Sequence, residues 1–213
     1  MVAIITTRNG EKAIHIGMKI LKAGGSALDA VEETIKFVED DPRDYTVGYG
    51  GLPNLLGEVE LDASIMDGKT LKAGAVASVK HYKNPISIAR KVMVLTPHVL
   101  LVGEGAEKFA EFIGFIKTDL LTQESRSKYE EWTRGKSQIY SERYTKLSQN
   151  LFGWYKKYVG SIKSTGTVNV IALDADGNLA AGASTSGLFM KLPGRVGDSA
   201  IFGAGNYADN RYG

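Results

Sequence analysis

The 213-residue chain contains no cysteine. This absence excludes a disulfide framework, a thiolate metal site and a cysteine nucleophile. It also fits a reducing compartment, because disulfides persist mainly in oxidising ones. No apolar run approaches the roughly 20 residues that a membrane helix needs, and the opening residues lack the basic region of a secretory signal. We therefore expect a soluble, cytoplasmic protein that does not interact with membranes.

Histidine and net charge are also scarce. The three histidines, His15, His81 and His98, show neither i,i+4 spacing nor a metal-binding motif. We therefore expect no metal and no cofactor, and a Ser-His-Asp hydrolase is improbable. Gly103-x-Gly105 resembles the start of a dinucleotide-binding fingerprint, but Lys108 stands where the third glycine belongs. The net charge of +2 does not indicate a nucleic-acid partner.

Residues 125–164 form a polar, net basic segment with interspersed tyrosines and tryptophans. Such a segment could be a nucleic-acid surface or a solvated linker. Because acidic residues interrupt it, the linker is the favoured interpretation.

The remaining sequence predicts a single domain of mixed α/β class. The apolar periodicities and turn signals place helices and strands alternately along the chain. Ser26 is a good N-cap for one of the helices, and Pro42 prevents that helix from continuing. We expect helices over 11–22, 27–41, 85–94 and 105–112, and strands over 1–8, 58–66, 73–79, 99–102 (buried), 167–173 and 179–184.

A threonine, Thr167, opens the strand pattern TVNVIAL and follows a glycine and the polar linker. An internal threonine is a poor nucleophile because its hydroxyl has no adjacent base. If the Gly166–Thr167 bond were cut, Thr167 would gain an α-amine with a pKa near ~8 that could accept the hydroxyl proton. Most Gly-Thr pairs merely begin strands, so the pattern alone leaves both interpretations open.

The residues around Thr167 carry a family resemblance. The segment from Gly166 to Ser199, which contains GASTSG and GRVGDS, resembles the nucleophile region of the glycosylasparaginase and asparaginase/isoaspartyl peptidase family of N-terminal nucleophile (Ntn) hydrolases. The form GYGGLP resembles the glycosylasparaginase branch most. Upstream of Gly166, further motifs of this family occur in the family's order at 24–32, 47–54, 61–68, 74–76, 83–92 and 100–106.

The resemblance implies a four-layer αββα Ntn-hydrolase sandwich formed by one domain, 1–213. Residues 1–166, with a linker at about 125–164, would form the α-subunit region, and 167–213 would begin the β-subunit region. The chain would cut itself between Gly166 and Thr167. Thr167 would then attack the side-chain amide of a small asparagine-like substrate, which could be a glycosylasparagine, L-asparagine or a β-aspartyl peptide, and release aspartate. A homodimer is also expected.

The resemblance assigns roles to three further residues. Thr185 corresponds to a hydroxyl that tunes the nucleophile. Arg195 corresponds to the residue that binds the substrate α-carboxylate, for which a planar guanidinium is suited. Asp198 corresponds to the residue that accepts the α-ammonium. Taken without the resemblance, the sequence GRVGD could be a surface turn with an ion pair.

The chain departs from the family pattern at three places. Thr165-Gly166 stand where glycosylasparaginases carry His-Asp, and Arg8 stands where they carry a tryptophan that lines the substrate site. The family also continues past the equivalent of Gly213 into an A-T-G-x-G strand that supplies an oxyanion hole, so we expect a chain truncated at the C-terminus. The alternative function is an unprocessed, catalytically silent family member that acts as a folding or interaction module.

Overall fold

The computed structural model describes residues 1–134 and 166–212. Within these ranges, six strands form one sheet in the order β1-β5-β6-β2-β3-β4. Neighbouring strands are antiparallel, except for β3 and β4, which are parallel. The strands are β1 (Ala3–Thr6), β2 (Leu61–Asp67), β3 (Ala73–Val79), β4 (Leu100–Val102), β5 (Val168–Leu173) and β6 (Leu179–Thr185).

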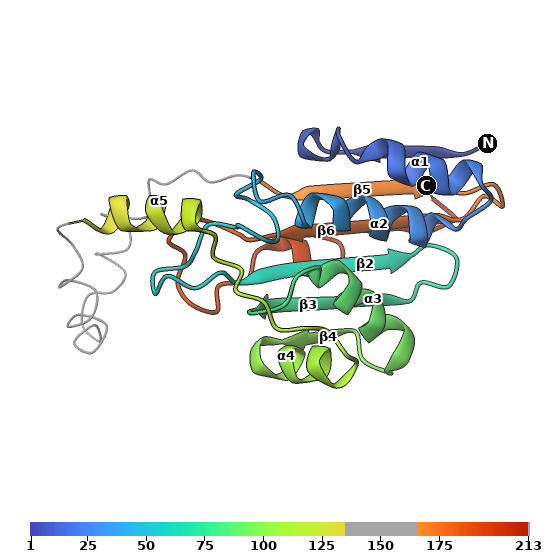
Figure 1. The fold of residues 1–213 in the computed structure, drawn as a ribbon. Helices are drawn as coiled ribbons and strands as arrows, with labels where there is room; N and C mark the ends of the chain where they lie inside the picture. The colour runs from blue at the N-terminus through green and yellow to red at the C-terminus, as the bar shows by residue number, and fades with distance from the viewer. Residues whose placement is uncertain (135–165, 213) are drawn as a thin grey trace.

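Helices cover one face of this sheet. Figure 1 shows α1, α2 and α3 packed over the strands on that face, with α4 beside β4 and α5 beyond the strand ends. The helix α3 also provides the crossover that two parallel strands such as β3 and β4 require. The helices are α1 (Ile14–Lys22), α2 (Ala27–Glu39), α3 (Pro85–Leu95), α4 (Gly103–Phe112) and α5 (Gln123–Thr133).

The helix α2 forms for reasons that are local to its sequence. The Ser26 hydroxyl accepts a hydrogen bond from the Asp29 N–H at 3.1 Å, which caps the first turn as predicted. Val31, Ile35 and Val38 form a buried stripe that faces the sheet. The helix therefore begins at its cap and buries the apolar face that its periodicity predicts.

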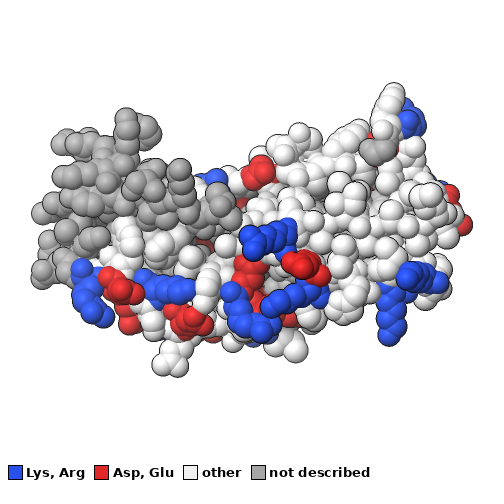
Figure 2. All heavy atoms as spheres, turned by 90° about the horizontal axis from the view of Figure 1, so that it is seen from above, with Lys and Arg blue, Asp and Glu red and all other residues white. Residues whose placement is uncertain are grey.

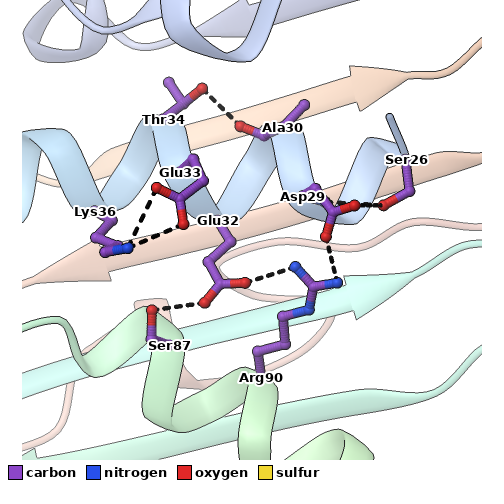
Figure 3. A network of polar contacts seen from close by, with 9 residues as sticks. All are labelled: Ser26, Asp29, Ala30, Glu32, Glu33, Thr34, Lys36, Ser87 and Arg90. Carbon is purple, nitrogen blue, oxygen red and sulfur yellow. Dashed lines mark hydrogen bonds and ion pairs between the residues drawn. The ribbon is translucent and has the colours of Figure 1, made fainter. Parts of the chain in front are cut away.

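A polar network fixes α2 against α3 (Figure 3). The guanidinium of Arg90 on α3 forms ion pairs with Asp29 and Glu32 on α2, both at 2.6 Å. The Ser87 hydroxyl donates to the second carboxyl oxygen of Glu32, also at 2.6 Å. These contacts link the two helices that cover the centre of the sheet.

The opposite face of the sheet carries the other side chains of the same strands. Ser64 on β2 points to this face, where its hydroxyl bonds the carbonyl of Ser199 in the segment that follows β6. Ile5 and Ile171 lie opposite each other in β1 and β5, and their side chains are exposed there. The described residues thus make one helical layer and one sheet, which are two layers of an αββα sandwich. The mixed α/β class is confirmed.

Three expected elements differ from the structure by three residues at one boundary or in their burial. The strand expected over 58–66 begins at Leu61. The first helix begins at Ile14 rather than at residue 11, because a short 3-10 turn, Arg8–Gly10, precedes it. The strand at 99–102 was expected to be buried, and this prediction was wrong. Leu100 and Val102 are 44% and 55% exposed because β4 is the edge strand of the sheet.

The polar segment 125–164 differs from its prediction at its start. Residues 125–133 belong to α5, where Tyr129 donates a hydrogen bond to the carbonyl of Leu55 at 3.1 Å. Its remainder lies almost entirely outside the described residues, so the linker interpretation stays a prediction there. Across the described ranges, no helix is both long enough and apolar enough to cross a membrane.

Candidate active site

The hairpin of β5 and β6 places two threonines side by side. Val168 pairs with Ser184 in the antiparallel register, so Thr167 and Thr185 lie opposite each other at the open end of the hairpin. Val168, Val170 and Ala172 of β5 are buried against the helical layer. Burial of this strand therefore fixes the position of the threonine that precedes it.

All five residues that the sequence predicted for the site lie around one cavity of about 400 Å³. They come from the segment before β5, the end of β6 and the loop that follows β6. The cavity is lined by Gly166, Thr167, Thr185, Arg195 and Asp198, together with Thr7, Asn169, Gly187, Leu188 and Gly197.

The Thr185 hydroxyl is held in one orientation. Its oxygen accepts a hydrogen bond from the Gly187 N–H at 2.9 Å and donates to the Gly166 carbonyl at 2.8 Å. The carbonyl of Thr46 is a more distant acceptor at 3.3 Å. Thr185 is 3% exposed, so little water competes for these bonds. A hydroxyl donor thus points at the carbonyl of the bond that precedes Thr167.

Thr7, at the end of β1, holds the backbone of the residues that follow this bond. Its hydroxyl accepts a hydrogen bond from the Asn169 N–H at 3.0 Å, and its one proton can go either to Asn9 Oδ1 at 2.8 Å or to the Thr167 carbonyl at 3.1 Å. The sequence reasoning missed Thr7, because a single threonine after a strand carries no local pattern. Only the pairing of β1 with β5 brings it to Thr167.

Gly166 lies against the side chain of Thr46. A methyl group added at Gly166 would overlap the Cβ and Oγ1 atoms of Thr46. Thr46 is itself fixed, because its N–H and its hydroxyl both bond the Asp44 carboxylate, the N–H at 2.9 Å. An aspartate could not stand at position 166 unless Thr46 moved, which gives a physical reason for the glycine found there.

Arg195 and Asp198 bring opposite charges to the cavity wall. Arg195 is partly exposed, and Asp198, the first residue of a 3-10 turn Asp198–Ala200, is exposed. Within the described parts of the chain, neither side chain forms a hydrogen bond or an ion pair, and the two do not pair with each other. Both are therefore available to a ligand, and the GRVGD segment is not a turn closed by its own ion pair.

A second cavity of about 590 Å³ lies at the same peptide bond and shares Thr7, Gly166 and Thr167 with the first. Arg8 lies in its wall, at the position where the family pattern carries a tryptophan. Arg43, another wall residue, forms an ion pair with Asp41 at 2.7 Å. The larger cavity is thus polar and opens onto the residues that could react.

No metal centre is evident where the structure can be described. No group of three or more histidines, aspartates and glutamates there could hold a metal ion. His15 packs edge-on against Phe37 with the ring centres 6.4 Å apart. On the face seen in Figure 2, acidic and basic side chains lie next to one another rather than in separate patches.

Known proteins to which this chain is similar carry asparaginase names. The sequence model of the family described as asparaginase matches residues 5–213. The N(4)-(beta-N-acetylglucosaminyl)-L-asparaginase of Elizabethkingia miricola is 49% identical, over 92% of this chain and 52% of its own length. The isoaspartyl peptidase/L-asparaginase of Mus musculus is 47% identical, over 95% and 57%. The plant-type L-asparaginase of Pyrococcus furiosus is 48% identical, over 93% and 62%. The chain thus spans between about half and three-fifths of the length of these relatives.

Proposed function

Because this chain belongs to the asparaginase family, we propose that it is an amidohydrolase that activates itself by cutting the Gly166–Thr167 bond. Thr167 would then release aspartate from the side-chain amides of asparagine derivatives. One observation carries the proposal. The Thr185 hydroxyl donates to the Gly166 carbonyl at the edge of a cavity that all the predicted site residues line.

In the uncut chain, the Thr167 Oγ attacks the Gly166 carbonyl carbon. A C–O bond forms, the C–N bond breaks, and the hydroxyl proton passes to the departing amine nitrogen. Water then hydrolyses the ester, which leaves a carboxylate on Gly166 and a free α-amine on Thr167. The Thr185 hydroxyl stabilises the negative charge that develops on the Gly166 oxygen, as an oxyanion donor does.

In the cut chain, the same oxygen attacks the side-chain amide carbon of the substrate. The free α-amine of Thr167 takes the hydroxyl proton, which a threonine within the chain could not arrange. The amine or ammonia of the substrate leaves with a proton, and water releases aspartate from the ester on Thr167. Thr7 supports this reaction because its hydroxyl accepts from the Asn169 N–H and lies within hydrogen-bond distance of the Thr167 carbonyl, next to the nucleophile.

The two unpaired charges in the cavity wall suit an amino-acid head group. Arg195 can bind the α-carboxylate through its planar fork, and Asp198 can accept the α-ammonium. The larger cavity beyond Thr167 supplies space for the leaving group. Three substrates fit this description: glycosylasparagine, L-asparagine and β-aspartyl peptides. They match what the names of the relatives state for those proteins.

The homodimer and the cytoplasmic location belong to the same proposal. The exposed Ile5 and Ile171, side by side on the sheet face away from the helices, support further packing on that face.

Release of aspartate tests the activity. We expect the purified chain to release aspartate from at least one of the three substrates, because the nucleophile and both head-group charges share one cavity. The Thr167→Ala variant should release none, since it lacks the attacking oxygen. An enzyme-coupled aspartate assay measures both.

Thr96→Ala is the matched control, because the Thr96 hydroxyl bonds only the Val92 carbonyl of α3 and the His98 N–H just beyond that helix, and Thr96 lies outside the cavity. It should behave as the wild type does. A wild-type chain that releases no aspartate from any of the three substrates would contradict the proposed activity and favour the silent-homologue alternative.

A further inference from the structure

Three charged side chains are buried directly behind the Arg195 loop. Glu60, Asp62 and Lys191 are 2%, 0% and 0% exposed, and they come from the start of β2 and from the loop after β6. Charged side chains are almost never fully buried unless they are paired, because burial removes their hydration. The mechanism proposed above uses none of the three.

Glu60 fixes the loop on the N-terminal side of Arg195. Both oxygens of its carboxylate accept from the Gly194 N–H, at 3.0 and 3.2 Å. The Ser78 hydroxyl donates to one of these oxygens at 3.0 Å. The residue immediately before Arg195 is therefore tied to the sheet through a buried carboxylate.

Asp62 fixes the loop on the other side of Arg195. One of its oxygens accepts from the Gly197 N–H at 3.2 Å, and the other accepts from the Ser78 N–H at 2.8 Å. Burial raises the pKa of the Asp62 carboxyl, and the charges of Lys191 and Arg195 act in the opposite direction. The hydrogen bonds from the Ser78 and Gly197 N–H groups also lower the pKa of Asp62, so the carboxylate is stabilised by the backbone as well as by the cations.

Lys191 lies between these carboxylates and the cavity. Its ammonium donates to the backbone carbonyl of Glu60 at 3.0 Å. A Cβ added at Gly187, which lines the cavity, would lie 3.1 Å from the Lys191 Nζ and 3.3 Å from an Arg195 Nη. Burial lowers the pKa of Lys191, and the charges of Asp62 and Glu60 oppose that change. Two carboxylates (Glu60 and Asp62) and two cations (Lys191 and Arg195) therefore lie close enough under the cavity wall for their opposite charges to stabilise one another.

We infer that Glu60 and Asp62 are positioning residues. By binding the backbone N–H groups of Gly194 and Gly197, on either side of Arg195, they hold the Arg195 guanidinium where it can bind the substrate α-carboxylate. The inference rests on the proposed function, which assigns that carboxylate to Arg195. A buried polar network whose members are all bonded restricts its residues to one arrangement. The guanidinium can then bind a carboxylate without the entropy cost of ordering the Arg195 loop.

Ligand binding tests this inference without any need for catalysis. The probes are L-aspartate and 3-aminopropanoate, which keeps the amine and the side-chain carboxylate but lacks the α-carboxylate. Dissociation constants come from NMR titration of the full chain. We expect Asp62→Asn to weaken L-aspartate binding by about tenfold. An amide has only one acceptor oxygen, so asparagine can keep the hydrogen bond from either the Ser78 N–H or the Gly197 N–H but not both. Binding of 3-aminopropanoate should stay unchanged.

Gly197→Ala is a second variant that leaves the buried charges intact. Its new methyl group would lie 3.0 Å from an Arg195 Nη, so it displaces the guanidinium directly. It should reproduce the selective loss of L-aspartate binding. Gly105→Ala is the matched control, because a methyl group there meets open space on α4. In an Arg195→Leu background, Asp62→Asn should have no further effect on L-aspartate.

The outcomes separate this inference from the proposed function. Equal weakening of both ligands, no weakening of either, or a wild type that does not distinguish them would overturn the positioning role. A chain that shows the selective loss but never releases aspartate from an amide would contradict the proposed activity alone.

Discussion

The hydroxyl of Thr185 is the single group on which the proposed self-cleavage depends most. It receives one hydrogen bond from the Gly187 N–H and gives one to the Gly166 carbonyl, so its proton has a fixed direction. The same burial that excludes water strengthens this donor, because the local dielectric is low. A small polar side chain at the end of β6 thus bonds the carbonyl at which the proposed self-cleavage would occur.

Thr185→Val removes this donor but keeps the shape of the side chain. We expect the cut between Gly166 and Thr167 to slow by about 10²–10³-fold, which is the usual loss when one oxyanion donor is removed. The fraction of uncut chain, followed by intact mass spectrometry over time, gives the rate.

Thr185→Ser is the matched control, because serine keeps the hydroxyl and can accept from Gly187 and donate to Gly166. It should cut at a rate within a few-fold of the wild type. If Thr185→Val cuts as fast as Thr185→Ser, the hydroxyl does not assist the reaction.

Among the elements, α2, α3 and β6 meet at one buried carboxyl, that of Glu39. One of its oxygens accepts from the Ser184 hydroxyl on β6 at 2.6 Å and from the Ile86 N–H at the start of α3 at 3.1 Å. Complete burial raises the pKa of Glu39 to about 8, although these hydrogen bonds oppose the change. The helical layer and the strand that ends at Thr185 therefore share a carboxyl that folding keeps protonated.

This raised pKa gives stability a defined pH dependence. The folded chain holds the Glu39 proton up to a pH of about 8, whereas the unfolded chain releases it near 4.5. The contribution of Glu39 to the free energy of unfolding is therefore complete below about pH 4.5 and is lost as the pH rises through 8. Glu39→Gln, which never ionises, should remove this part of the slope of unfolding free energy against pH.

Urea unfolding between pH 5 and 9 measures that slope. Glu104→Gln is the control, because Glu104 is exposed and pairs only with Lys108 on the same helix; it should keep the wild-type slope over this range. A Glu39→Gln chain whose stability falls with pH as steeply as that of the wild type would show that Glu39 is not the titrating group.

Much at this scale could be predicted from the sequence, because the signals were local. The Ser26 cap, Pro85 at the start of α3 and the β5–β6 hairpin depend on residues within a few positions of each other. The exposure of β4 was not predictable, because an edge strand and a central strand of three apolar residues read alike. Sheet order, not sequence, decides which of them it is.

The candidate site was predictable in the same uneven way. Thr167, Thr185, Arg195 and Asp198 were predicted through a family resemblance within one continuous segment, and their catalytic roles stay predictions. Thr7 was not predicted, because it follows β1 and only the pairing of β1 with β5 brings it to Thr167. Contacts between residues more than a hundred positions apart leave no pattern in a single sequence.

The whole described molecule is arranged so that the residues of the proposed site lie at one end of its sheet. The end of β1, the start of β5 and the end of β6 meet there, and the loop after β6 returns to the same place with Arg195 and Asp198. The helices lie on one face (Figure 1), so the residues of the proposed site are positioned by a sheet whose centre is packed. The site thus rests on rigid strands and on a loop tied to them.

The intact mass and the new N-terminus of the purified chain test the central claim most directly. The uncut chain has a mass of 23.0 kDa. Self-cleavage predicts that it divides into residues 1–166 and 167–213, with threonine as the first residue of the smaller fragment, and that the Thr167→Ala chain stays whole. A wild-type chain that keeps its full mass under conditions in which it is folded, or a Thr167→Ala chain that divides at the same bond, would contradict the claim.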